Sequence, residues 1–223
     1  MVWKRIFGPV PSQGLDPIKA TILEMLANDR HSFDLATSAL LAGADVEIVG
    51  PELLETDRNV NEATAAVRRK LVVHVGVHGA NEVTPVLAFM SIVKDAERVG
   101  DYAKNIRDIA RQGVDLSHED DQGELSAYRD RVSSLITEAA RIFGEEDVDG
   151  ARVLHSEGDR MLDDFDQRVD AYVRSELPGS SAVPRALFYR YLKRIVAHLM
   201  NMLTALIMPL DRLDYFDESP GTR

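Results

Sequence analysis

The 223-residue chain contains no cysteine. This absence excludes disulfides, thiolate zinc sites, iron–sulfur clusters and cysteine nucleophiles at once. The chain also lacks a run rich in lysine and arginine, and its formal net charge is −11. A surface of that sign repels nucleic-acid phosphates and anionic lipid headgroups, so we expect no direct nucleic-acid binding.

Long apolar runs are missing as well. The longest one, from Leu199 to Leu210, contains Asn201 and Pro209 and is too short to span a bilayer. The first eight residues are basic and aromatic but lack the apolar core of a signal peptide. Hydrophobic residues make up 45% of the chain and charged residues 28%, as in ordinary globular proteins. We therefore expect a cytoplasmic protein without membrane insertion.

Helical periodicity dominates the chain, and the alternation typical of strands is almost absent. Asp16-Pro17 has the pattern of a helix start with Asp16 as its cap, Gly43 is a plausible stop, and Gly50-Pro51 either kinks or restarts the next helix. Long helices with short loops pack antiparallel, so the sequence predicts an all-α fold of two tandem three-helix bundles. The expected parts are an irregular arm (1–15), a first unit (16–113), a polar acidic linker, a second unit (123–211) whose last helix covers 183–210, and a tail (212–223).

The most informative segment lies on the third expected helix, from about Glu82 to Gln112. Glu97 follows Val93 by four residues and so falls in line with the apolar stripe, and Asp101 lies one turn further along. On the second expected helix Asp57 also faces inward, and Asn61 follows it by one turn. An acidic pair and an acid–amide pair therefore face each other from neighbouring helices.

Two explanations of these residues remain open. A divalent or trivalent cation would offset the cost of burying carboxylates, and oxygen donors suit a hard or borderline ion. Alternatively, Glu97 and Asp101 form ion pairs with Arg98, with Lys94 or with a basic group from another helix.

Residues 95–106, Asp-Ala-Glu-Arg-Val-Gly-Asp-Tyr-Ala-Lys-Asn-Ile, are similar to the best-marked motif of the PhoU family. This resemblance implies that Glu97 and Asp101 are metal ligands with Asp57 as a partner, and that the ion is iron or zinc. We add Asn61 to the expected ligands because of its spacing from Asp57, and manganese to the expected ions. It also implies a regulator of phosphate uptake that contacts a membrane phosphate transporter or a sensor kinase. Separately, Leu and Met residues on an exposed face of the bundle favour self-association, so we expect a homodimer. The resemblance is sharp only over residues 83–106, so the chain resembles a divergent member.

The second unit departs from this motif. When Arg98 is aligned with Arg194, Lys193 takes the place of Glu97 and Ala197 that of Asp101. Asp159 and Asp163 keep the acidic spacing on the fifth expected helix and remain weaker metal candidates, although their positions point toward solvent. We expect the duplicated architecture to persist while the metal chemistry of the second unit is lost.

Motifs of known catalytic sites are missing from the sequence. There is no phosphate-cradling Gly-rich loop, no Gly-x-Ser-x-Gly and no His-Glu-x-x-His. A di-iron enzyme is disfavoured because such bundles use Glu-x-x-His pairs, which the chain lacks. We therefore expect a regulatory adaptor and no enzyme, with a metal-free structural interaction protein as the alternative.

Two further features have simpler explanations. His74 and His78 have a spacing that suits a metal, but their place at a helix end favours an exposed or capping role. The acidic run from Asp115 to Glu124 has the composition of a solvated linker.

Overall fold

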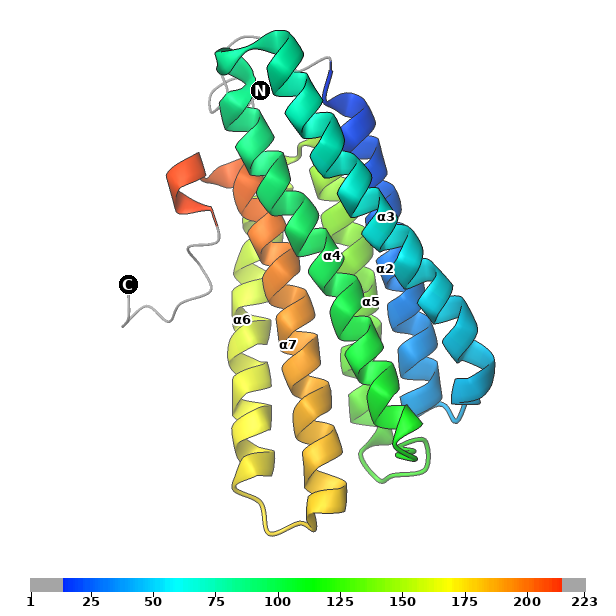
Figure 1. Ribbon diagram of the computed structural model, residues 1–223. Coiled ribbons are helices and arrows are strands. Elements are labelled where there is room, and N and C mark those ends of the chain that lie inside the picture. The colour runs from blue at the N-terminus through cyan, green and yellow to red at the C-terminus, as the bar shows by residue number, and fades with distance from the viewer. Residues whose placement is uncertain (1–13, 214–223) are drawn as a thin grey trace.

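The computed structural model describes residues 14–213, which form six α-helices and two short 3-10 turns and contain no strand (Figure 1). Apart from Gly14 and Leu15, the predicted arm lies outside the described residues, as does the predicted tail beyond Leu213. The all-helical prediction is confirmed. The elements are α2 (Asp16–Leu41), α3 (Val46–His78), η1 (Ala80–Glu82), α4 (Val83–Arg111), α5 (Gln122–Glu145), α6 (Val148–Val173), α7 (Gly179–Ile207) and η2 (Leu210–Arg212).

The helices form two three-helix units that lie side by side along one long axis (Figure 1). Short connections make sequence neighbours antiparallel within each unit. Between the units, α2 packs on α5 and α4 packs on α7. The helices α3 and α6 lie at opposite edges of the molecule (Figure 1). Because α3 is an edge helix, the surface that it shares with α4 faces solvent.

The helix ends agree with the sequence patterns in part. Asp45 caps α3 by accepting a hydrogen bond from Glu47 N at 2.9 Å, and Gly43 has a φ of 66°, which suits glycine in the turn before it. The predicted cap at Asp16 is wrong, because Leu15 is the capping residue and makes no side-chain cap bond. Pro51 lies inside α3, so the helix neither stops nor restarts there.

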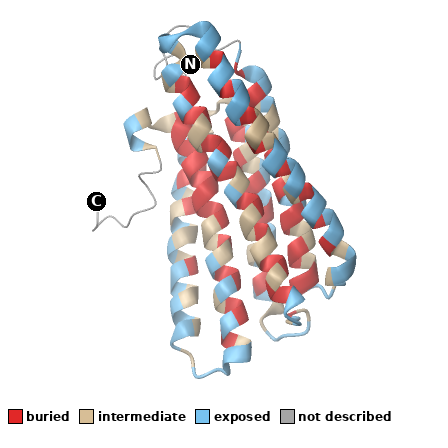
Figure 2. Ribbon diagram, viewed as in Figure 1, coloured by how far each residue is buried: buried red, intermediate tan, exposed pale blue. Residues whose placement is uncertain are grey.

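Both units share a single hydrophobic core. Buried residues from all six helices form one continuous cluster, and Figure 2 shows them concentrated on the helix faces that meet inside the molecule. Phe89 of α4 and Phe143 of α5 meet edge to face with their ring centroids 6.3 Å apart. Such aromatic pairs add to the energy of simple burial. The two units are therefore packed as one body. Within residues 14–213, none of the helices is apolar enough over a sufficient length to cross a lipid bilayer.

The acidic linker is exposed at Asp115, Glu119, Asp120 and Glu124, as predicted for a solvated segment, but it is also held to the bundle by Arg185. The Arg185 side chain of α7 is buried and donates hydrogen bonds to both oxygens of Asp121, at 2.7 and 2.9 Å. It also donates to Glu119 at 2.8 Å. These hydrogen bonds from Arg185 hold the pKa of Asp121 below its ordinary value of 3.8. The charged linker thereby anchors the start of α7.

Replacing Asp121 with asparagine is expected to destabilise the protein at pH 7. A carboxyl with a lowered pKa contributes stability above its unfolded value of about 3.8, and loses it as the pH falls through the lower folded value. The Asp121→Asn protein should therefore lose less stability than the wild type below pH 4. Urea unfolding at pH 7 and pH 3 measures this, with exposed Asp120→Asn as the control. Equal acid dependence in all three proteins would contradict the role of the Asp121–Arg185 pair.

Candidate metal-binding face of α3 and α4

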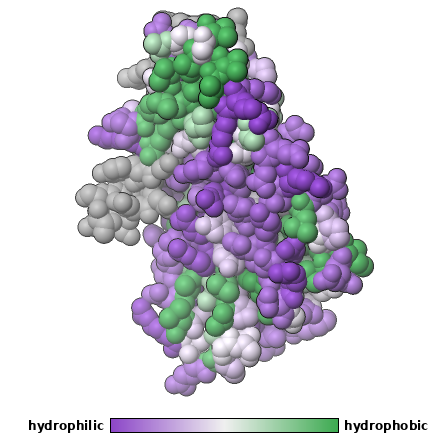
Figure 3. Space-filling view, viewed as in Figure 1, coloured by the Kyte–Doolittle hydropathy of each residue, from purple (hydrophilic) through white to green (hydrophobic). Residues whose placement is uncertain are grey.

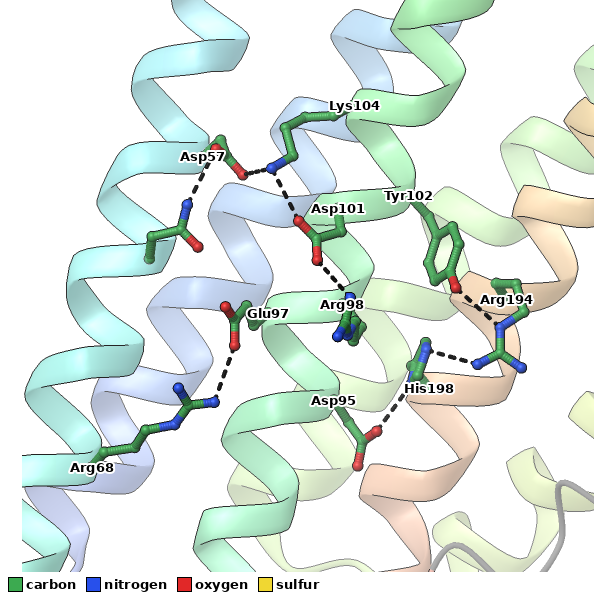
Figure 4. Close-up of polar contacts among 11 residues, drawn as sticks. Asp57, Arg68, Asp95, Glu97, Arg98, Asp101, Tyr102, Lys104, Arg194 and His198 are labelled. Atoms are coloured by element: carbon green, nitrogen blue, oxygen red, sulfur yellow. Dashed lines mark hydrogen bonds and ion pairs between the residues drawn. The ribbon is translucent and has the colours of Figure 1, made fainter.

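The middle of the surface formed by α3 and α4 is hydrophilic, whereas apolar side chains gather where α3 ends and α4 begins (Figure 3). The exposed apolar residues near that end include Val73, Val77, Val83 and Leu87. Within the hydrophilic middle, Asp57 of α3 faces Asp101 of α4 (Figure 4). The structure thus places the acids predicted from the sequence on one solvent-facing surface.

Lys104 joins the two helices across this surface. Its Nζ lies 2.7 Å from Asp57 Oδ1 and 3.0 Å from Asp101 Oδ1. Asn61 donates a hydrogen bond to the other Asp57 oxygen at 3.2 Å. Burial acts to lower the pKa of Lys104, but the hydrogen bonds to Asp57 and Asp101 outweigh it, so this pKa lies above its ordinary value. Lys104 is therefore held as an ammonium ion between two carboxylates.

Glu97 is half-buried beside this group and has a different partner. Arg68 of α3 donates to Glu97 Oε2 at 3.2 Å, and Arg98 donates to Asp101 Oδ2 at the same distance (Figure 4). As these side chains lie, no three acidic or histidine side chains in the described part of the chain surround one point where an ion could sit. The donor types fit a hard cation, but in this arrangement they are neutralised by lysine and arginine.

Asp29 of α2 is a fourth carboxylate of this group that sequence reasoning missed. It is completely buried, and neither of its oxygens has a hydrogen-bond partner among the described residues. Burial raises its pKa well above the ordinary value, and the charges of Asp57, Asp101 and Glu97 add to the increase. A signal was present, because Asp29 lies four residues after Met25 and four before Phe33 on the buried face.

A second, partly buried network joins the two units between α4 and α7, on the other side of α4 from Asp57 (Figure 4). His198 Nδ1 lies 2.9 Å from Asp95 Oδ1, and Arg194 Nη2 lies 3.3 Å from His198 Nε2 (Figure 4). Since a guanidinium only donates, the geometry fits a neutral imidazole that accepts at Nε2 and donates to Asp95. Tyr102 stacks on His198 with a centroid separation of 5.8 Å. No local pattern could link Asp95 to a partner 103 residues away.

The corresponding residues of the second unit form pairs of a different kind. Lys193, at the position of Glu97, binds both oxygens of Asp166 at 2.6 and 2.8 Å. Asp159 lies 3.5 Å from His155, whose side chain is buried, while Asp163 is exposed. Ala197 is buried. The structure therefore does not bring Asp159 and Asp163 together with a second acidic pair.

His74 differs from its prediction as an exposed or capping residue. It is buried, its Nε2 lies 3.1 Å from Glu82 Oε2, and its ring lies 4.4 Å from that of His78. The Cβ that an alanine would carry at Gly14 would lie 2.7 Å from the His74 ring. The two histidines thus pack at the hairpin between α3 and α4.

Comparison with known proteins identifies the class to which this fold and motif belong. Residues 22–110, which span most of the first unit, match the family model of the PhoU domain. The crystal structure of PhoU from Pseudomonas aeruginosa matches with a TM-score of 0.73 and 21% sequence identity, over 90% of this chain and 98% of that chain. No curated protein sequence matches the chain.

The domain match and the shared fold define a helical-bundle protein of the PhoU type. Residues 22–110 of the chain are thus a PhoU domain, and the whole chain has the fold of the Pseudomonas aeruginosa protein. The domain match ends at residue 110, before the second unit begins.

Proposed function

We infer that the chain is a regulatory adaptor of phosphate signalling that binds a metal ion on the acidic face of α3 and α4. The observation that carries this inference is the PhoU domain match over residues 22–110, which includes both the acidic pair of α4 and the acid–amide pair of α3. Regulation of phosphate uptake or signalling is the function associated with this family. The partner that we propose is a membrane phosphate transporter or a sensor kinase, contacted from the cytoplasmic side. Self-association as a homodimer stays a prediction.

The residues proposed to hold the ion are Asp57, Asn61, Glu97 and Asp101. Their carboxylate and amide oxygens suit iron, manganese or zinc, with manganese and ferrous iron the better matches to an all-oxygen set. A bound ion would neutralise these acids in place of Lys104 and Arg68, and would join α3 to α4. Asp159 and Asp163 are proposed only as a weaker site, because no second acidic pair faces them.

The alternative function is that of an interaction protein without metal. The pairs of Lys104 with Asp57 and Asp101, and of Arg68 with Glu97, favour it, because they already neutralise the acids. Under this alternative the acidic face is a set of ion pairs that stabilises the contact of α3 with α4. Metal analysis distinguishes the two functions.

The double variant Glu97→Gln/Asp101→Asn is expected to lose bound metal. Each replacement keeps the side-chain size but removes the charge that an oxygen-coordinated cation requires. The measurement is elemental analysis of protein purified without chelator or affinity tag. Asp159→Asn/Asp163→Asn is the matched control, because it removes two acids at the same spacing from α6, and it should retain the metal.

Absence of metal from the wild-type protein, after incubation with manganese, iron or zinc, would contradict metal binding and favour the alternative. The regulatory part is tested separately in a strain that lacks this chain. Phosphate uptake should then no longer depend on the external phosphate concentration, and the wild-type gene should restore that dependence. Uptake that keeps its dependence in the deletion strain would contradict the regulatory function.

A further inference from the structure

Asp29 is a buried carboxyl group without a hydrogen bond, in the middle of α2. Both of its oxygens are enclosed by protein, and neither has a partner in residues 14–213. Burying such a group without a partner costs free energy, so stability of the metal-free fold does not explain its presence. An unpartnered buried carboxyl of this kind is suited to coordinating a bound cation.

The Asp29 carboxyl approaches α4 at Gly100. A Cβ placed on Gly100 of α4 would lie 2.5 Å from Asp29 Oδ1, so a larger residue there would push this carboxyl aside. Gly100 lies between Glu97 and Asp101 in the sequence of α4. The Asp29 carboxyl therefore reaches α4 at the turn that carries both predicted ligands.

Lys104 is the cation that bridges Asp57 and Asp101 in this structure. Its ammonium lies between Asp57 and Asp101, the two acids whose charges act most strongly on Asp29 (Figure 4). The Lys104 side chain is about a quarter exposed and ends a flexible stem, so it can move into solvent without unfolding a helix. The Lys104 ammonium thus occupies the position between Asp57 and Asp101 that a metal ion would take, and it can move away.

We propose that a divalent cation enters this face by exchange with the Lys104 ammonium, and that Asp29 is its ligand from beneath, together with Asp57 and Asp101. The proposal rests on the metal binding proposed above and adds a ligand from a helix outside the motif. These three carboxylates from α2, α3 and α4 do not surround one point as the side chains lie, so the departure of Lys104 must let them rotate toward the ion. Their oxygens suit a cation such as Mn²⁺. Lys104 is then a competitor that sets the affinity of the site.

The proposal predicts opposite effects for two single replacements. Asp29→Asn should weaken Mn²⁺ binding by at least about tenfold, because a charged ligand is lost. Lys104→Gln should strengthen it by about tenfold or more, because no ammonium must be displaced. The experiment is a titration of the full chain with Mn²⁺, in which the electron paramagnetic resonance signal reports free Mn²⁺.

Matched controls are Glu24→Gln on α2 and Lys70→Gln on α3, both exposed, which should bind like the wild type. Thermal unfolding by circular dichroism without metal verifies that each variant is folded, and Lys104→Gln tests the exchange even if Asp29→Asn does not fold. Wild-type affinity in Asp29→Asn would overturn the role of Asp29, and unchanged or weaker binding in Lys104→Gln would overturn the exchange. If neither the wild type nor Lys104→Gln binds Mn²⁺, the proposed metal function itself fails.

Discussion

Replacing Phe143 with alanine is expected to lower the free energy of unfolding by about 3–5 kcal/mol. Phe143 is fully buried near the end of α5 and meets Phe89 of α4 edge to face. The replacement removes apolar contacts and leaves a cavity between the two units, which the closely packed helices cannot fill. Urea unfolding followed by circular dichroism measures the loss.

The control is Val153→Ala on α6, whose side chain is 71% exposed and which should change the unfolding free energy by no more than about 0.5 kcal/mol. Because the hydrophobic core is continuous, the Phe143 variant should still unfold in one transition. Two separate transitions, or a loss below about 1 kcal/mol, would show that this contact does not couple the units.

The variant His198→Ala is expected to cost about 3–5 kcal/mol of unfolding free energy. Asp95 is 1% exposed, and its Oδ2 has no hydrogen-bond partner within the described chain. Removing His198 takes away the hydrogen bond to Oδ1 and leaves a buried carboxylate with Lys94 at 4.0 Å. Guanidinium chloride unfolding at pH 7 gives the loss.

A double-mutant cycle measures the interaction energy between Asp95 and His198 separately from their other contacts. Adding Asp95→Asn to His198→Ala should recover part of the lost stability, because the buried charge is then absent. If the two losses simply add, the contact between Asp95 and His198 does not stabilise the junction of α4 and α7. Lys94→Ala serves as a control for the remaining exposed cation.

Much of the fold could be predicted from periodicity and helix-breaking residues. The predicted third helix, from Glu82 to Gln112, agrees with α4 (Val83–Arg111) to within a residue at each end. The last helix was predicted over 183–210 but covers Gly179–Ile207. The shift arises because Pro184 is accommodated inside the helix near its start, where the missing N–H costs little.

The candidate site could be predicted only at the level of helix faces. Spacing places Asp57 and Glu97 on neighbouring helices, but it cannot tell which long basic side chain each one meets. Lys104 and Arg68 reach across from the opposite helix, and such contacts depend on the distance and rotation between the helices. The spacing of Asp29 places it on the buried face of α2, but spacing cannot show that its carboxyl has no partner there. Buried acids usually have one.

The stacking of Tyr102 on His198 has a consequence for the origin of the two units. When Arg98 is aligned with Arg194, these two rings fall at the same position of the repeat, so one position packs against its own copy. Contact of a position with itself is the mark of an isologous interface in a homodimer. When two such copies are fused into one chain, the two contacting positions no longer need to carry the same residue. One half could then exchange its acids for Lys193 and Ala197 while the other half kept Glu97 and Asp101.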